Sequence, residues 1–367
     1  MSIRLIGDPE IIMQAECGPH NYFGWPSVAK LKNGKIAVSA SGFRLAHVCP
    51  FGKAVMAFSE DNGKTYTKPA PVIDTCLDDR DSGLCPFGKS GLIMTSFNNT
   101  LRFQRDWARK VVPESKKKYI EAYLDLIHPT EEERDLGSTF RVSFDNGTTF
   151  GPIYKSPITS PHGPTELADG TILWVGRTFS DNDSVQGDDC IMAYRIDVHT
   201  GKTEYLGKID PVFADGEKIL SCEPHAIQLS DGRIICHFRV QSDKGRRIFT
   251  TYQSESSDGG KHWSAPKQIL EITGGAPAHL LEHSSGVLIS SYGYRDEPYG
   301  IKVKFSTDGG RSFGCSERLY TNELTPDLGY PATVELDDQT LLTVFYAHPE
   351  KGSPATIMQQ KWRIEDR

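Results

Sequence analysis

The chain repeats one pattern of apolar and polar positions along its length. Each copy begins with a residue followed by proline, continues as a strand of alternating apolar and polar residues, and returns through a polar turn as a second apolar strand. Five copies occupy residues 24–40, 162–177, 222–239, 275–295 and 329–347. A sixth copy, at 79–97, has a longer turn instead of the proline. Six units of about fifty residues, each one antiparallel sheet of four strands, predict an all-β fold, the six-bladed β-propeller.

A second phrase, Ser-x-Asp-x-Gly-x-x-aromatic, occurs at 59–66, 143–150, 256–263 and 306–313. Asn-Gly or Gly-Gly at its tip supplies the positive φ of a tight hairpin, while the aspartate accepts backbone N–H bonds and the aromatic ring packs beneath. A calcium loop is the alternative, but such a loop needs several oxygen ligands and a late bidentate glutamate, and each copy reliably offers one acid. We therefore interpret the phrase as a self-capped turn, which sets the register of the blades and leaves the chemistry elsewhere.

Two blades lack a clear copy of this turn. The third blade has a degenerate version of the turn at 197–205. The sixth blade reaches the end of the sequence near residue 367 before its last strand, and residues 3–13 can supply that closing strand. Within blade two, residues from about 102 to 134 have helical spacing and charged faces, which predicts a helical insertion. We expect a structural or interface role for this insertion, with a lid as the alternative. The whole chain, 1–367, is expected to form one propeller domain.

Composition and charge narrow the function further. The chain has 38% hydrophobic residues but no apolar run long enough for a membrane span, and its net charge of −7 offers no basic footprint for nucleic acid. The eight cysteines show no zinc-ligand spacing and no glycine loop is suited to phosphates, so no metal or organic cofactor is expected. The first residues lack the apolar core of a signal peptide, which indicates a cytoplasmic protein or an exported one whose signal has been removed. Nothing in the sequence indicates an oligomeric state.

The repeated turns on six blades resemble those of the sialidase (neuraminidase) superfamily, where they are called Asp boxes or BNR repeats; the resemblance covers about residues 20–365. It implies that these turns lie on the outer edge of the blades and that the site lies at the starts of the innermost strands. It further implies an exo-acting glycoside hydrolase with a glycan substrate. In such enzymes a Tyr–Glu pair provides the nucleophile, three arginines bind the carboxylate of sialic acid, and a loop aspartate is the acid/base.

Four residues match that site in chain order. The resemblance implies Tyr330 as nucleophile, Glu223 as the group that activates it, and Arg239 and Arg295 as carboxylate ligands. A neutral hydroxyl that passes its proton to a glutamate avoids driving one anion at another, and the guanidinium fork suits a carboxylate. As alternatives, the tyrosine and glutamate satisfy hydrogen bonds within the propeller, and the arginines pair with acids of a neighbouring blade.

Two positions depart from the family pattern. Trp25 stands where sialidases have the first carboxylate-binding arginine, and its aromatic wall favours stacking on a sugar face. The following loop contains no aspartate; its polar groups are Arg44, a candidate for the third arginine, and His47, which titrates in the range required of an acid/base. An exposed histidine without a catalytic role is the alternative for His47.

Four further residues are predicted to bind substrate. Asp79 and Asp81 open blade two, where carboxylates can bind substrate hydroxyls, and His162 and His225 flank the starts of inner strands that face the funnel. Strand alternation predicts that His225 and Glu223 share a face.

Three functional hypotheses follow from these residues. The first is a sialidase-like hydrolase that removes a terminal acidic sugar, either a sialic acid or relative or a uronic acid. The second is a propeller enzyme that hydrolyses or eliminates another sugar, such as a uronic acid or deoxysugar, through His and Tyr acid–base chemistry. The third is a carbohydrate-binding propeller without catalysis. The retained tyrosine, glutamate and two arginines favour the first hypothesis, and the missing aspartate favours the third.

Overall fold

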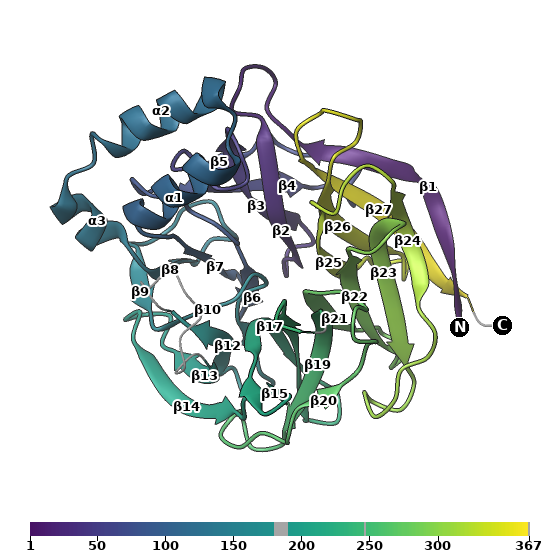
Figure 1. Ribbon diagram of the computed structural model, residues 1–367. Helices are drawn as coiled ribbons and strands as arrows, with labels where there is room; N and C mark the ends of the chain where they lie inside the picture. The colour runs from purple at the N-terminus through teal and green to yellow at the C-terminus, as the bar shows by residue number, and fades with distance from the viewer. Residues whose placement is uncertain (180–189, 246, 366–367) are drawn as a thin grey trace.

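The computed structural model describes residues 1–179, 190–245 and 247–365. Its strands form six antiparallel sheets arranged as the blades of a ring (Figure 1). Five sheets have four strands, and in the third blade the innermost strand is split into two short pieces that both pair with the next strand. The predicted six-bladed propeller is therefore confirmed.

The strands of each blade run outward from the axis in chain order, except that the N-terminal strand is the outermost strand of the sixth blade. The first three blades consist of β2 (Tyr22–Lys30), β3 (Ile36–Arg44), β4 (Lys53–Ser59) and β5 (Ala70–Ile73); β6 (Leu84–Phe87), β7 (Gly91–Phe97), β8 (Ser138–Ser143) and β9 (Tyr154–Ser156); and β10 (Ile158–Thr159), β11 (Thr165–Glu166), β12 (Ile172–Thr178), β13 (Ile191–Ile196) and β14 (Thr203–Ile209). A small hairpin follows, made of β15 (Phe213–Ala214) and β16 (Glu217–Lys218). The last three blades consist of β17 (Leu220–Gln228), β18 (Ile234–Ser242), β19 (Ile248–Ser256) and β20 (Lys267–Gln268); β21 (Ala278–Glu282), β22 (Leu288–Tyr294), β23 (Tyr299–Ser306) and β24 (Glu317–Asn322); and β25 (Gly329–Glu335), β26 (Leu341–Ala347), β27 (Thr356–Glu365) and β1 (Ser2–Met13).

The ring is closed by strands from opposite ends of the chain. Strand β1 pairs antiparallel with β27, from Ser2 opposite Glu365 to Met13 opposite Ile357. Figure 1 shows the purple N-terminal strand beside the yellow C-terminal one. The closing strand predicted from residues 3–13 is thus confirmed, and it completes the sixth blade.

The repeated turns connect the third and fourth strands of blades 1, 2, 4 and 5. In the first copy, Ser59 Oγ accepts the N–H of Gly63 at 2.9 Å and Asp61 Oδ1 accepts the N–H of Thr65 at 2.9 Å. The turn of blade 3 occupies the same position, with Asp197 accepting the N–H of His199 at 2.9 Å. The acids therefore cap their own turns, as the hairpin interpretation predicts.

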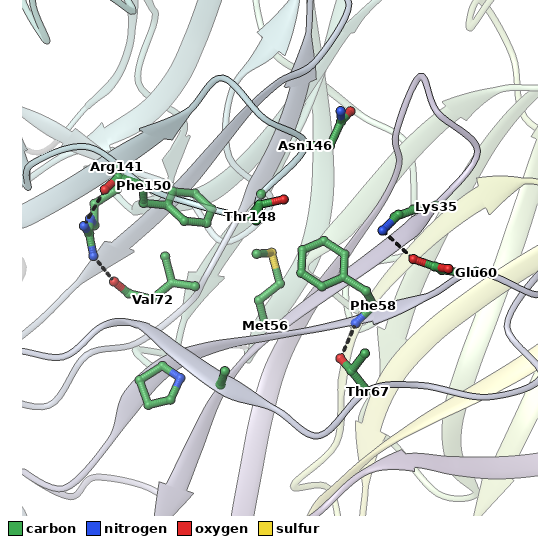
Figure 2. A pocket seen from close by; sticks show the side chains of 13 residues that line it. Lys35, Met56, Phe58, Glu60, Thr67, Val72, Arg141, Asn146, Thr148 and Phe150 are labelled. Atoms are coloured by element: carbon green, nitrogen blue, oxygen red, sulfur yellow. Dashed lines mark hydrogen bonds and ion pairs between the residues drawn. The ribbon is translucent and has the colours of Figure 1, made fainter.

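A groove between blades 1 and 2 shows how such a turn meets its neighbour (Figure 2). This pocket of about 480 Å³ is lined by Met56 and Phe58 of β4 and by the turn that contains Gly147. The guanidinium group of Arg141 donates to the carbonyls of Val72 at 2.7 Å and of Phe150 at 2.8 Å, which ties the two blades together. None of the predicted site residues lines this groove.

A second set of contacts joins neighbouring blades at the far ends of the innermost strands. In each case the last residue of the strand accepts a backbone N–H from the first hairpin turn of the preceding blade. The pairs are Glu166 with Gly88 at 2.8 Å, Gln228 with Ala168 at 2.7 Å, Glu282 with Ser230 at 2.7 Å and Glu335 with Ser284 at 2.8 Å. These bonds fix the rotation between blades and so position the inner strands around the axis.

Three helices lie between β7 and β8: α1 (Leu101–Val111), α2 (Glu114–Leu124) and α3 (Pro129–Asp135). They confirm the helical insertion predicted at about 102–134. Ala108 and Ile120 pack with Leu45 of the loop that follows β3, and Lys116 Nζ donates to the carbonyl of Leu45 at 2.8 Å. The insertion therefore supports the loop that carries His47. Among the described residues, no helix has the length and apolar character needed to cross a membrane.

Candidate active site

Four blades have a residue in the left-handed backbone conformation near the start of the innermost strand. Trp25, Asp81, Glu223 and Tyr330 have φ values of 52°, 47°, 52° and 50°. A non-glycine residue costs about 1 kcal/mol or more in this conformation, and such strain concentrates at functional sites. At Trp25, Glu223 and Tyr330 the strand pairing also shifts register, because the bulge breaks the ladder beside the following proline. The same left-handed backbone conformation is thus repeated near the starts of the inner strands, where the sequence predicts the site.

Tyr330 and Glu223 meet across the axis from blades 6 and 4. Tyr330 Oη donates to Glu223 Oε1 at 2.5 Å, and Arg239 Nη1 donates to both oxygens of the same carboxylate, at 3.0 and 2.8 Å. Burial raises the pKa of Tyr330 well above its usual range, and the negative charge of Glu223 raises it further. Burial also acts to raise the pKa of Glu223, but Arg239, the hydrogen bond from Tyr330 and the charge of Arg295 together outweigh it and lower the pKa. The resting pair is therefore a neutral tyrosine bonded to a carboxylate.

Three guanidinium groups lie near Tyr330. Arg295 lies 5.8 Å from the centroid of the Tyr330 ring, and its Nε donates to the carbonyl of Leu328 at 3.2 Å. Arg239 is the second group. The third is Arg80, which lies 4.2 Å from the centroid of the Trp25 ring and has a buried Nε without a hydrogen-bond partner among the described residues. Arg80 Nη1 also lies 3.9 Å from Asp78 Oδ2, and the charges of Asp78, Asp81 and Tyr330 raise the pKa of Arg80 against the effect of burial.

Trp25 and Arg44 lie beneath this layer. Trp25 is only 1% exposed, with Arg80 over its ring and Arg44 4.8 Å from the ring centroid. Arg44 is fully buried, and its Nη2 pairs with Asp78 Oδ1 at 2.6 Å and donates to the carbonyl of His47 at 2.8 Å. The side chain predicted as the third carboxylate ligand thus has donors committed to the protein, and Arg80 lies in the more accessible position.

His47 belongs to a network centred on Asp327. His47 Nδ1 lies 3.1 Å from Asp327 Oδ1, and His348 Nε2 lies 3.1 Å from Oδ2. Tyr22 and Tyr346 donate to the same carboxylate at 2.9 and 3.0 Å. Burial acts to raise the pKa of Asp327, but the bonds from the two histidines outweigh it and hold that pKa well below its usual range.

The ionised Asp327 defines the state of His47. An ionised carboxylate can only accept hydrogen bonds, so His47 Nδ1 carries the proton that is donated to Asp327. His47 Nε2 takes no part in this bond. Burial lowers the pKa of His47 below its usual 6.5, whereas the hydrogen bond to Asp327 acts in the opposite direction. The ring lies between Trp25, at 4.8 Å edge to face, and Trp107 of α1, at 6.0 Å and nearly parallel.

Asp81 lines a pocket of about 240 Å³ with Glu223, Arg239, Gln241 and Arg177. Its buried Oδ1 has no hydrogen-bond partner among the described residues. Burial raises the pKa of Asp81 to about 7, and the nearby charge of Glu223 contributes to the rise. A carboxyl group with such a pKa is partly protonated at neutral pH and can donate a hydrogen bond to a substrate oxygen.

The remaining predicted ligands lie outside this pocket. Asp79 is fully buried and accepts the N–H of Thr75 at 2.6 Å. His162 and His225 lie below the strand starts with their ring centroids 5.3 Å apart. His225 hydrogen bonds with blade 5 rather than lying beside Glu223, because the bulge after Glu223 interrupts simple strand alternation.

No protein-family model matches the chain, and no curated protein matches it in sequence. Solved structures match it in fold. A Dyadobacter fermentans protein of unknown function is 22% identical with a TM-score of 0.77, over 99% of this chain and 100% of that one. The NanB sialidase of Streptococcus pneumoniae is 14% identical with a TM-score of 0.66, over 97% of this chain and 70% of that one. The intramolecular trans-sialidase of Ruminococcus gnavus is 14% identical with a TM-score of 0.63, over 96% and 97%.

The chain has the six-bladed propeller fold of the sialidases. The same fold likeness extends to a Penicillium chrysogenum α-L-arabinanase, which is 14% identical with a TM-score of 0.59 over 97% of this chain and 98% of that one. At these identities the likeness concerns the fold, so the chemistry has to be argued from the residues at the axis.

Three residues that the structure places at the candidate site were not found from the sequence: Arg80, Asp327 and Tyr22. Arg80 stands between Asp79 and Asp81, and Asp327 stands three residues before Tyr330. Their proximity to predicted residues was the available signal. Tyr22 carried no such signal beyond its place three residues before Trp25, because its contact with Asp327 joins residues at opposite ends of the chain.

Proposed function

We propose that the protein is an exo-acting glycoside hydrolase that removes a terminal acidic sugar, with Tyr330 as nucleophile. The observation that carries the proposal is the 2.5 Å hydrogen bond from Tyr330 Oη to Glu223. Tyr330 attacks the anomeric carbon while its proton passes to Glu223, and the bond to the leaving oxygen breaks. In the second step water attacks the same carbon and Tyr330 leaves, regaining the proton from Glu223. A neutral nucleophile suits an anomeric centre that bears a carboxylate.

Arg80, Arg239 and Arg295 bind the substrate carboxylate in this proposal. Arg239 already bonds Glu223, so a substrate carboxylate that shares Arg239 reduces its effect on Glu223 and raises the proton affinity of that base. Arg80 replaces the arginine that Trp25 displaces: it comes from the next blade and lies across the indole ring. Trp25 and Arg44 then act as the support beneath it.

Replacement of Arg80 by glutamine is expected to raise KM for acidic glycosides about 10- to 100-fold, because a charge-assisted hydrogen bond contributes about 1.5–3 kcal/mol. Turnover of neutral glycosides with the same leaving group is expected to change little. Steady-state kinetics on chromogenic α-sialosides, uronides and deoxysugars measures both effects. Arg233→Gln is the matched control, since Arg233 pairs with Asp231 and Glu255 away from the axis. An equal loss on acidic and neutral substrates would exclude Arg80 as a carboxylate ligand.

His47 supplies the acid in the proposed reaction. Its Nδ1 is oriented by Asp327, so Nε2 donates a proton to the leaving oxygen and later accepts one from the attacking water. Asp327 is a positioning residue that acts through His47. Tyr22 stabilises the arrangement by donating to Asp327, with its oxygen also 3.0 Å from His47 Nδ1.

The pH profile tests this role. Because the acid must be protonated and burial lowers the pKa of His47, kcat/KM is expected to fall about tenfold per pH unit above a limb that lies below pH 6.5. Asp327→Asn removes the bond that raises this pKa, so the limb is expected to move to lower pH by about one unit. Asp338→Asn, at an exposed turn of blade 6, serves as the control. A limb that does not move in Asp327→Asn would show that His47 is not the titrating acid.

The contact between Tyr22 and His47 supports a second candidate function. A His–Tyr pair can perform acid–base hydrolysis or elimination on a uronic acid or deoxysugar without a covalent intermediate. A fluorinated glycosyl fluoride of the active substrate class distinguishes the two candidates by intact-protein mass spectrometry. A stable glycosyl adduct on Tyr330 supports the first function. Turnover without an adduct supports the second, and sugar binding without any turnover would indicate a binding propeller.

A further inference from the structure

His348 directly follows β26, and both nitrogens of its ring face oxygen atoms. Nε2 lies 3.1 Å from Asp327 Oδ2, and Nδ1 lies 2.7 Å from the carbonyl oxygen of Ser353. The loop that contains this carbonyl is held by its own bonds, because Ser353 Oγ donates to the carbonyl of Glu350 at 2.7 Å and accepts the N–H of Glu350 at 3.1 Å. The imidazole is therefore fixed between a carbonyl and a carboxylate.

These two oxygen atoms define the charge of the ring, because both can only accept hydrogen bonds. A backbone carbonyl has no proton to donate, so His348 Nδ1 carries one. Asp327 is ionised, and its Oδ2 already accepts a hydrogen bond from Tyr22 at 2.9 Å, so Nε2 carries a second proton. Burial acts to lower the pKa of His348, but the bonds to Asp327 and Ser353 and the charge of Asp327 outweigh it and raise the pKa.

The charge of His348 reaches His47 through the carboxylate that the two histidines share. His47 Nδ1 lies 3.1 Å from Asp327 Oδ1, the oxygen that His348 does not contact. The negative charge of Asp327 stabilises the protonated form of His47. A cation bonded to the other oxygen of the same carboxylate weakens this effect, so His47 releases its proton more readily.

The other groups around the two histidines do not cancel this effect. Arg80 and Arg44 also act on His47, and their positive charges favour its neutral form as well. Tyr22 and Tyr346 bond Asp327 but add no charge, since burial and the neighbouring carboxylate raise the pKa of each hydroxyl well above its usual range.

We propose that His348 is an imidazolium cation and a positioning residue, which acts through Asp327 to make His47 a stronger acid. A stronger acid donates its proton more readily to a poor leaving oxygen, and it confines the reaction to lower pH. This consequence for turnover rests on the proposed function. The charge of His348 and its effect on His47 are properties of the free protein and can be measured without a substrate.

NMR of the free protein tests the charge directly. Proton–nitrogen correlation spectra of the full chain with isotope-labelled histidine report which ring nitrogens carry a proton. The signals of His47 and His348 are assigned by their loss in His47→Gln and His348→Gln. Near pH 7 both nitrogens of His348 are expected to be protonated in the wild type. A singly protonated His348 ring at that pH would overturn the proposal.

The variant His348→Gln tests the effect on His47. It removes the positive charge and keeps an amide N–H for Asp327. The pKa of His47, followed by the same NMR titration, is expected to rise by about half a unit to one unit, whereas Asp327→Asn lowers it. The alkaline limb of kcat/KM should move upward with it. His348→Lys keeps a cation and should leave the pKa of His47 near its wild-type value.

His283→Gln is the matched control. His283 is also a buried histidine beside a carboxylate, with Nε2 3.4 Å from Glu335, but it lies in a turn at the far end of blade 5. The pKa of His47 should not change in this variant. A loss of turnover in His348→Gln with an unmoved pKa of His47 would indicate a structural role and overturn the proposal.

The outcomes for His348 and for the hydrolase are separable. Absence of turnover on every glycoside would count against the hydrolase alone, because the NMR titration of His47 requires no substrate. If His348→Gln does not fold, the protonation state of His348 in the wild-type spectrum still decides the proposal, since a neutral ring has no charge to act through Asp327.

Discussion

Replacement of Tyr330 by phenylalanine is expected to lower kcat/KM by about a thousandfold or more while leaving the fold and the sugar affinity nearly unchanged. The nucleophile is lost, whereas the aromatic ring and the left-handed backbone at the start of β25 are kept. The loss should fall on kcat, because the carboxylate ligands Arg239 and Arg295 remain. Stopped assays on the best substrate of the chromogenic panel, combined with calorimetric binding of the free sugar, measure the two quantities separately.

Tyr292→Phe is the matched control for this experiment. Tyr292 is also a buried tyrosine, but its hydroxyl bonds Ser316 within blade 5 rather than a residue at the axis. Its turnover should stay close to that of the wild type. Unchanged turnover in Tyr330→Phe would exclude the tyrosine nucleophile and leave the His47 acid–base reaction as the remaining catalytic hypothesis. Rescue of Tyr330→Phe by added fluoride would support Tyr330 as the nucleophile, whereas a glycosyl adduct at another residue would point to a different nucleophile.

The propeller could be predicted because its information is local and repeated. Each blade carries its own strand alternation and turn, and six weak patterns at similar spacing reinforce one another. The bounds of the insertion were predictable for the same reason, since helical periodicity replaces strand alternation between Phe97 and Ser138. The split inner strand of blade 3 was not predicted, because the interruption between β10 and β11 occupies only a few residues.

Candidate site residues could be predicted only where a single residue matches one position of the sialidase pattern. Glu223 and Tyr330 open their own strands, and the structure brings them into contact. The position of Arg80 over Trp25 could not be predicted, because an arginine of blade 2 lies across a side chain of blade 1. Strand alternation describes faces within a blade and contains no information on which side chains of adjacent blades cross. The network around Asp327 could not be predicted for the same reason, since Tyr22 and His47 each lie more than 250 positions from Asp327 in the sequence.

The two predicted aspartates of blade two have different surroundings, which the sequence does not reveal. Asp81 has the left-handed backbone found near the strand starts and faces Glu223 in the pocket. Asp79, two residues earlier, is turned into the protein, where Thr75 donates to it through both N–H and Oγ, at 2.6 and 3.0 Å. The left-handed backbone at Asp81 separates a pocket carboxyl from a buried structural one, and a single sequence shows no difference between the two.

Asp79→Asn is expected to stabilise the protein at pH 8 and to have little effect near pH 4. Burial raises the pKa of Asp79 from 3.8 to about 7, with a contribution from the neighbouring charge of Asp78. The folded state therefore binds more protons than the unfolded state between these pH values, and the free energy of unfolding decreases as pH rises through the window. The ionised group costs up to about 4 kcal/mol at pH 8. Asparagine mimics the protonated acid, with an oxygen for the N–H of Thr75 and an amide for its hydroxyl.

Urea unfolding of Asp79→Asn and of the wild type at a series of pH values measures this difference, which should grow from pH 4 to pH 7 and then level off. His162→Phe provides a control of opposite sign. Burial holds the pKa of His162 well below 6.5, so the unfolded state binds the extra proton as pH falls, and wild-type stability is lost below pH 6.5. The phenylalanine variant therefore gains on the wild type toward acid by up to about 1.4 kcal/mol per pH unit. A pH-independent difference for Asp79→Asn would mean that this carboxyl stays ionised in the folded protein, paired within the buried network around Arg44.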